Sequence, residues 1–193
     1  MKLSIRILLI FMLVITIRLN AQENMTSDQK TIQIGAELQF YPAGYMPTIT
    51  ANFFVKEHLA IRVRVGGNFA DRSDFSIYND EEKAKGFGGT IGVQRYFPYW
   101  KGNFIVGIYV DGWNMWTDWK DNVDSVHPQS GTTYNFVIQP WINAGYLFQV
   151  TKQWNAGMTF GVGREFNVIT HGENVGEGWM GILALSANYT FNK

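Results

Sequence analysis

The sequence predicts an all-β fold: an eight-stranded antiparallel up-and-down barrel that crosses a membrane with its strands. Alternating hydrophobicity, the lengths of the connections and the placement of aromatic and glycine residues lead to this prediction. The chain has 193 residues, of which 46% are hydrophobic, 16% aromatic and only 17% charged. Such a length suits one domain, and the apolar fraction excludes a disordered chain.

The first 21 residues have the three-part layout of a secretory signal peptide. Lys2 and Arg6 precede an apolar run over residues 7–17, in which Thr16 is the one polar residue, and Ala21 precedes a polar stretch that begins at Gln22. A run of eleven residues is too short to cross a bilayer core of about 30 Å as a helix. We therefore expect cleavage after Ala21, a short polar segment over 22–30 and a barrel domain over 31–193.

Apolar and polar residues alternate strictly in the mature chain. Successive side chains of a strand point to opposite faces, so this period of two predicts strands that have one apolar face. The pattern recurs in these segments: Ile32 to Phe40, Ile49 to Val55, Leu59 to Phe69, Phe87 to Val93, Phe104 to Val110, Tyr134 to Phe148, Trp154 to Val162 and Leu183 to Phe191. The sequence therefore predicts an even number of strands and an antiparallel set.

The connections between these segments alternate in length. Short ones cover 55–58, 98–103 and 150–153, whereas long polar ones cover 71–85, 115–133 and 167–178. Only the first connection of the second group, 41–46, is short. Short turns at one end and long loops at the other are typical of a bacterial outer-membrane barrel, whose short turns face the periplasm.

Glycines and aromatic residues favour an apolar face that looks outward. Small residues suit the crowded interior of a narrow barrel, and the polar faces hold Gly35, Gly66, Gly88, Gly92, Gly107, Gly145, Gly157, Gly161 and Gly163. Aromatic girdles mark the two membrane interfaces, and the strand ends carry Phe40, Tyr41, Tyr45, Tyr96, Phe97, Tyr99, Trp100, Trp113, Trp116, Trp119, Tyr146, Phe148, Trp154, Tyr189 and Phe191. The alternative is a soluble lipocalin-like carrier, which would turn its apolar face inward around an apolar ligand.

The Asn20-Ala21-Gln22 junction, the alternating segments and the terminal Leu183–Phe191 strand resemble the small OmpA/OmpX-type outer-membrane barrels. The resemblance covers essentially the whole mature chain. It implies the outer membrane of a Gram-negative cell, contacts with outer-membrane lipids and lipopolysaccharide, and a monomer. It also implies that the barrel-insertion machinery reads an assembly signal in the last strand, formed by Leu185, Ala187, Tyr189 and Phe191. A fold of this kind specifies architecture rather than activity.

The composition excludes several kinds of chemistry. The chain has no cysteine, which excludes disulfides, thiol nucleophiles and cysteine-based zinc sites. Sixteen basic residues balance sixteen acidic ones, so no basic footprint for nucleic acid is present. His58, His127 and His171 fall in different connections without metal-ligand spacing. We therefore predict no catalytic, cofactor-binding or metal-binding residues.

Two enzymatic alternatives compete with this prediction. The connection with Asp124, Ser125, His127 and Ser130 contains the residue types of a hydrolytic triad, but a solvated loop explains them better. The segment around His171 loosely resembles the histidine region of the lipid A deacylases, which are outer-membrane acyl hydrolases. That family places its serine two residues after the histidine, where this chain has Glu173, so the nucleophile is absent.

Four charged residues fall on the inward faces of the predicted strands: Glu37, Arg62, Arg64 and Asp111. Charges in a narrow lumen are costly unless they pair, so we expect them to form a salt-bridge cluster. The alternative is a gate for small ions.

The long loops carry most of the acidic residues, and we expect these to project outward: Asp71, Asp74, Asp80, Glu81, Glu82, Asp118, Asp121, Asp124, Glu173 and Glu177. Trp116 and Trp119 belong either to an interfacial belt or to a contact surface for an unknown ligand. The predicted function is a non-enzymatic outer-membrane barrel with a narrow or plugged lumen. It would serve envelope integrity, or surface interaction through acidic loops.

Overall fold

The computed structural model describes residues 31–74, 76 and 78–191; the expected signal peptide and the segment 22–30 lie outside them. The described residues contain no helix that could span a membrane. They form nine strands: β1 (Ile32–Tyr41), β2 (Gly44–Lys56), β3 (Leu59–Asp71), β4 (Glu81–Tyr99), β5 (Gly102–Asp121), β6 (Gln129–Gln149), β7 (Trp154–Arg164), β8 (Phe166–His171) and β9 (Trp179–Phe191).

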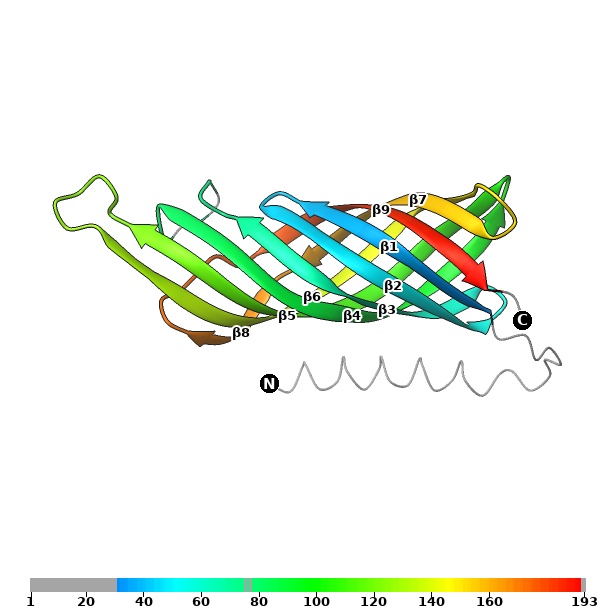
Figure 1. Cartoon of the computed structure of the whole chain (residues 1–193), viewed down its shortest axis with the longest axis horizontal. Helices are drawn as coiled ribbons and strands as arrows, with labels where there is room; N and C mark the ends of the chain where they lie inside the picture. The colour runs from blue at the N-terminus through cyan, green and yellow to red at the C-terminus, as the bar shows by residue number, and fades with distance from the viewer. Residues whose placement is uncertain (1–30, 75, 77, 192–193) are drawn as a thin grey trace, which may run out of the picture.

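The strands close into a barrel (Figure 1). Each strand from β1 to β6 pairs antiparallel with the next one along the chain. β9 pairs with β1 on one side and with β7 on the other, and β7 pairs with β6, which completes the cylinder. The predicted antiparallel up-and-down topology is therefore confirmed.

β7 and β8 are two parts of one barrel wall element that breaks at Glu165. β7 pairs with the C-terminal part of β6, as far as Trp141↔Gly163. β8 pairs with the N-terminal part of β6, starting at Ile138↔Phe166. The amide of Glu165 donates instead to the carbonyl of Gly178. Counted as one element, β7 and β8 give the predicted total of eight barrel strands.

The predicted long loops are shorter than expected. β5 continues to Asp121 and β6 begins at Gln129, so the connection between them covers only 122–128. The β3–β4 connection covers 72–80, and all of β8 except Phe166 lies within the segment 167–178 for which the sequence predicts a loop. In β4 and β5, strand pairing continues beyond the apolar wall, where outward positions such as Lys83 and Lys120 are polar and hydrophobic alternation no longer indicates a strand. We call the end of the barrel that carries the connections 72–80, 122–128 and 172–178 the long-connection end. The opposite end is the short-turn end.

The apolar faces of the strands look outward. Ile49, Phe87 and Ile91 are 64%, 60% and 62% exposed, whereas Gln39 and Gln94 are fully buried in the lumen. The lipocalin-like alternative, which needs the opposite arrangement, is therefore wrong. The wall of this barrel is apolar and its interior is polar, as in a barrel that lipid surrounds.

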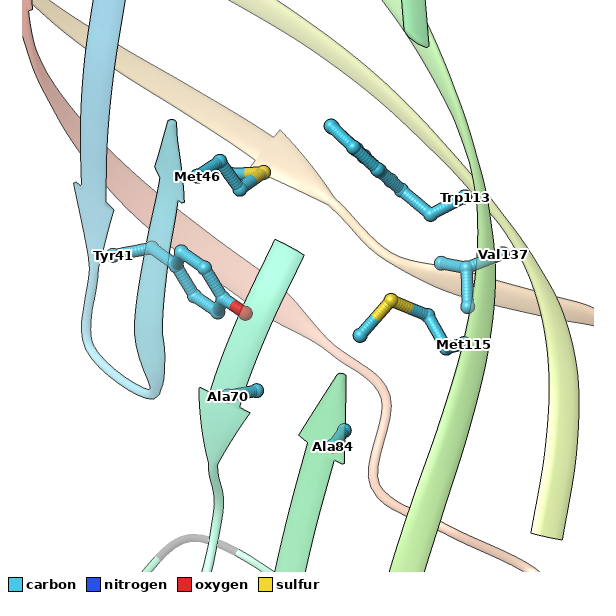
Figure 2. Close-up of a cluster of buried hydrophobic side chains, with 7 residues drawn as sticks. All are labelled: Tyr41, Met46, Ala70, Ala84, Trp113, Met115 and Val137. Carbon is cyan, nitrogen blue, oxygen red and sulfur yellow. The ribbon is translucent and has the colours of Figure 1, made fainter. Parts of the chain in front are cut away.

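Several aromatic residues point inward rather than into a girdle. Tyr41, Tyr96 and Trp113 were expected at the membrane interfaces, but all are buried inside the barrel. Trp113 is part of an apolar cluster near the long-connection end, which Figure 2 shows: Tyr41, Met46, Ala70, Ala84, Trp113, Met115 and Val137. Residue type did not reveal their direction, which follows from their odd or even position along the strand.

Glycines make room for these rings. A Cβ atom on Gly88 would lie 2.8 Å from a ring carbon of Trp113 and 2.9 Å from its Cα. The glycine-rich inward face that the sequence predicts therefore admits large aromatic side chains into a narrow lumen.

Candidate functional site

The structure brings the four predicted lumen charges together at mid-height in the barrel. Glu37 on β1 accepts hydrogen bonds from both arginines of β3, from Arg62 Nη2 at 2.5 Å and from Arg64 Nη1 at 2.7 Å. Arg64 also donates through Nη2 to both carboxylate oxygens of Asp111 on β5, at 3.0 and 3.1 Å. We call Glu37, Arg62, Arg64 and Asp111 the lumen charge cluster.

The cluster is electrically balanced and almost completely buried. Two guanidinium groups face two carboxylates, and the side chains of Arg64 and Asp111 are both 0% exposed. Burial of this kind is tolerated only where each charge is paired and its remaining donors and acceptors are used. The paired charges come from three separate strands, so the cluster forms only in the closed barrel.

Neutral side chains complete the hydrogen bonding of the cluster. Thr90 accepts from Arg64 Nε at 2.8 Å, and the indole nitrogen of Trp141 donates to Asp111 at 2.7 Å. The guanidinium carbon of Arg64 also lies 4.9 Å from the ring centroid of Trp141, which itself stacks on Tyr109. These contacts hold the Arg64 side chain in one fixed position inside the lumen.

A second buried ion pair lies nearer the long-connection end. Arg72, the first residue after β3, donates through Nη2 to Glu165 Oε1 at 2.5 Å. The other oxygen of Glu165 accepts from Gln139 Nε2 at 2.7 Å. Glu165 is the residue at which the wall breaks between β7 and β8, so the break turns a carboxylate into the lumen.

The β8–β9 connection crosses the mouth above this pair. Its backbone at Gly176 bonds to residues of the opposite wall: the carbonyl accepts from Arg72 Nη1 at 2.8 Å, and the amide donates to Glu82 Oε2 at 3.1 Å. Val175 beside it is only 2% exposed. We call residues 172–178 the cap.

Further hydrogen bonds fix the cap at neighbouring positions. Asn79 Nδ2 donates to the carbonyl of Asn174 at 3.2 Å, and Thr133 Oγ1 donates to that of Glu173 at 3.0 Å. Asn167 Nδ2 donates to the carbonyl of Val175 at 3.1 Å. The cap is therefore held by the β3–β4 connection, β6 and β8 together, which makes it an ordered part of the barrel.

Sequence reasoning missed Arg72, Glu165 and the cap. A signal for the two side chains existed, because Glu165 continues the inward register of Gly161 and Gly163, and Arg72 continues that of Asn68. The predicted strands stopped short of both residues. The cap had no such signal, since most of its hydrogen bonds use its own backbone.

One of the acidic loop residues was placed wrongly. Glu82 was expected to project outward, but it is fully buried and accepts hydrogen bonds from Ser76 and Asn79 as well as from Gly176. Its inward direction follows from its position in β4, which begins one residue earlier. Most of the other acidic residues of this group are exposed: Asp71, Asp74, Asp80, Asp118, Asp124, Glu173 and Glu177.

Trp116 and Trp119, which the sequence assigns to one belt or contact surface, do not form one surface. Trp116 has an outward position on β5 and packs against Phe87 and Tyr134, with ring centroids 5.8 and 5.4 Å away. Trp119 has the opposite parity on the same strand and is paired with Gly131. Trp116 thus lies among aromatic residues of the outer wall, while Trp119 lies on the other face of the β5–β6 hairpin.

The residues of the expected assembly signal lie together on the outer face of β9. Tyr189 packs edge-on against Phe191 and against Trp154 of β7, with ring centroids 4.7 and 5.3 Å away. Leu185 and Ala187 occupy the next outward positions on the strand that closes the barrel. Their recognition by the insertion machinery stays a prediction.

The residues considered for catalysis show no catalytic arrangement. In the 122–128 connection, the His127 amide donates to Ser125 Oγ at 3.1 Å, which is a turn contact, and both residues are exposed. His171 packs on Tyr134 with ring centroids 5.8 Å apart. Within the described part of the chain, no group of three His, Cys, Asp or Glu residues could hold a metal ion.

Comparison with known proteins bears on the fold. No protein-family model matches the chain, and no curated protein matches it in sequence. The structure is similar to that of Neisserial surface protein A, with a TM-score of 0.58 and 11% identity over 86% of this chain and 100% of that one. It is also similar to a major outer membrane protein from Thermus thermophilus, with a TM-score of 0.59 and 13% identity over 86% of this chain and 100% of that one. These similarities show an OmpA/OmpX-like fold of the small outer-membrane β-barrels.

Proposed function

We propose that this chain is a non-enzymatic integral outer-membrane protein with a sealed lumen. Its fold and its apolar outer wall support a location in the outer membrane. Ile32 pairs with Phe191, so β1 begins and β9 ends at the short-turn end, which is the periplasmic end in barrels of this type. The long-connection end would then face the exterior.

The observation that supports the proposal is that hydrogen-bonded groups from different strands meet across the lumen at two heights. The lumen charge cluster fills the centre, and the cap crosses the mouth above the Arg72–Glu165 pair. Between them, Trp113 donates to Gln139 at 3.0 Å, so aromatic and polar side chains also occupy the intervening space. An ion would have to break several charge-assisted hydrogen bonds to pass, each stronger than a neutral one.

Planar-bilayer recording tests the seal. We expect the parent protein to show little steady current after insertion. Arg64→Met together with Glu82→Ala loosens the centre and the mouth at once, and current should then rise. A stable large conductance in the parent would contradict the sealed lumen, and the gate for small ions would become the better description.

Cell fractionation tests the location. The protein should sediment with outer membranes and should migrate faster on a denaturing gel when the sample is not boiled, because a closed barrel resists detergent until heated. Recovery in the soluble fraction, without a mobility change, would contradict membrane insertion.

A sealed barrel leaves two roles for this protein, envelope integrity and surface interaction. Exposed carboxylates at the long-connection end support the second role, since lipopolysaccharide or an unknown surface ligand would meet them first. We propose no enzymatic activity, because Ser125 contacts His127 through the backbone amide rather than the imidazole, and Glu173 stands where the deacylases have serine.

A further inference from the structure

The outer wall has a groove where β1 ends before its neighbour β9 reaches the long-connection end. Pairing between β1 and β9 ends at Phe40↔Leu183, and the chain then turns at Pro42. β9 extends further, to Trp179, and there it pairs with β7 alone. This mismatch leaves a depression of about 380 Å³ between the β1–β2 turn and the upper part of β9.

The groove is apolar and its floor is open. Phe40, Phe160 and Leu183 line it from three strands, and Phe160 is 59% exposed. Gly181 lies in the groove, and no atom stands within 4 Å of the position that a Cβ on it would take. The absence of a side chain at Gly181 therefore leaves space that an extended hydrocarbon chain can fill.

Arg164 lies at the end of this groove that is nearer the long-connection end. Arg164 pairs with Trp179, one outward pair above Val162↔Gly181, and it occupies the same outward face of β7 as Phe160. Its guanidinium carbon lies 5.0 Å from the ring centroid of Phe166 and 5.7 Å from that of Trp179. Two rings thus hold an exposed cation in place at the rim of the apolar wall.

Arg164 forms no salt bridge with any carboxylate of residues 31–74, 76 and 78–191. Its chain neighbour Glu165 points into the lumen and is engaged by Arg72. The cation therefore keeps all its donors for an anion, and a guanidinium is well suited to a phosphate because it can donate two parallel hydrogen bonds.

We propose that Arg164 and the groove below it bind one phosphorylated lipid of the outer leaflet. The phosphate would lie on Arg164 and one acyl chain would lie along Phe160, Leu183 and Gly181. This inference rests on the membrane location proposed above, with the long-connection end outward, but not on the sealed lumen.

The test uses the full-length mature protein in octyl glucoside micelles, which contain no phosphate, with native mass spectrometry as the readout. The probe is dioctanoyl phosphatidic acid, and the comparison ligands are dioctanoylglycerol, which lacks the phosphate, and inorganic phosphate, which lacks the chains. We expect one tightly bound phosphatidic acid per barrel and about tenfold weaker binding of either comparison ligand.

Three variants separate the parts of the site. Arg164→Gln should weaken phosphatidic acid about tenfold, while Arg164→Lys should recover part of that loss. Gly181→Leu should fill the groove and lower the affinity without a steric conflict, given the open space at that position. Arg95→Gln is the matched control, because Arg95 is an exposed outer-wall arginine over Phe97 near the short-turn end, far from the groove.

Unboiled gel mobility verifies that each variant is folded. Unchanged affinity in Arg164→Gln, an equal loss in Arg95→Gln, or equal binding of dioctanoylglycerol would overturn the proposal. Arg64→Met, which alters the lumen, should bind the lipid as the parent does, so failure of this inference and failure of the sealed lumen are distinguishable.

Discussion

At the scale of the residue, Arg64 connects the two halves of the lumen charge cluster. It contacts both Glu37 and Asp111, whereas Arg62 contacts only Glu37. Removal of Arg64 would therefore leave Glu37 with one partner and Asp111 with none of opposite charge in the cluster. The structure thus identifies Asp111 as the residue whose neutralisation should compensate for the loss of Arg64.

Arg64→Met should lower the free energy of unfolding by about 3–5 kcal/mol, because it leaves a buried carboxylate unpaired. Asp111→Asn in the same chain should recover part of that loss. Urea titration of the barrel in lipid vesicles measures both effects, with Arg95→Met on the exposed outer wall as the control. Additive effects of the two lumen substitutions would show that the residues do not form an energetic pair.

On the outer wall, an introduced charge should destabilise the barrel, whereas in the lumen it is the removal of a charge that should do so. Ile91 is highly exposed on the outward face of β4, between the aromatic residues Phe87 and Phe97 of the same strand. Ile91→Arg should destabilise the inserted barrel by about 2–4 kcal/mol, the cost of arginine near the bilayer midplane. Val126→Arg, in the exposed 122–128 connection, should have almost no effect. Equal folding of both variants in vesicles would mean that the wall does not face lipid.

At the scale of the element, Glu82 is one of the side chains that hold the cap. Glu82 accepts from the Gly176 amide and also from Ser76 and Asn79, so it joins the cap to the β3–β4 connection. The neighbouring Glu81 only pairs with Lys120 at the surface, at 2.8 Å. Exposed ion pairs of this kind contribute little to stability.

Glu82→Ala should therefore release the cap, while Glu81→Ala should not. A glutamyl endopeptidase reports the difference, since Glu173 and Glu177 lie in the cap. We expect cleavage there to be about tenfold faster in Glu82→Ala, because a hydrogen bond to a charged group is lost at the opening step. Equal cleavage of the two variants would show that Glu82 does not anchor the cap.

How well the sequence predicts the direction of an inward residue depends on how far that residue lies from the long-connection end. Glu37 and Arg64 could be assigned to the lumen from sequence because apolar outward neighbours make the alternation visible. Glu82 and Arg72 lie where outward positions are polar as well, so the same period of two carries no contrast. Tyr41 and Trp113 are a different case: their residue type suggests an outward girdle, and only their parity along β1 and β5 places them inside.

At the scale of the whole molecule, the β1–β9 seam joins the two ends of the described chain and closes the barrel. Ala36 is paired with Ala187 across the seam, and Ala187 is paired with Ala156 on the next strand. Directly paired residues of antiparallel strands have Cα atoms about 4.5–5.5 Å apart, within the range of a disulfide. Residues two strands apart are about 10 Å apart and cannot be bridged.

Cysteines at Ala36 and Ala187 should therefore form a disulfide on mild oxidation, whereas cysteines at Ala36 and Ala156 should not. The chain has no other cysteine, so non-reducing gels report each pair without interference. The reaction should require the folded state and should be lost in urea. Efficient cross-linking of Ala36 with Ala156 would contradict the strand order of the barrel.

The wall of the barrel is also uneven in height, which bears on what large molecules can reach. β5 continues from the wall aromatic Trp116 to Asp121, and at about 3.4 Å per residue it carries its turn about 17 Å further along the strand. The β1–β2 hairpin turns much earlier, at Pro42 and Ala43 (Figure 1). An antibody against a peptide tag inserted in 122–128 should label intact cells, while the same tag at 42–43 should stay shielded by the surrounding saccharides. The β5–β6 hairpin is thus the side of the protein that antibodies or phage would meet first.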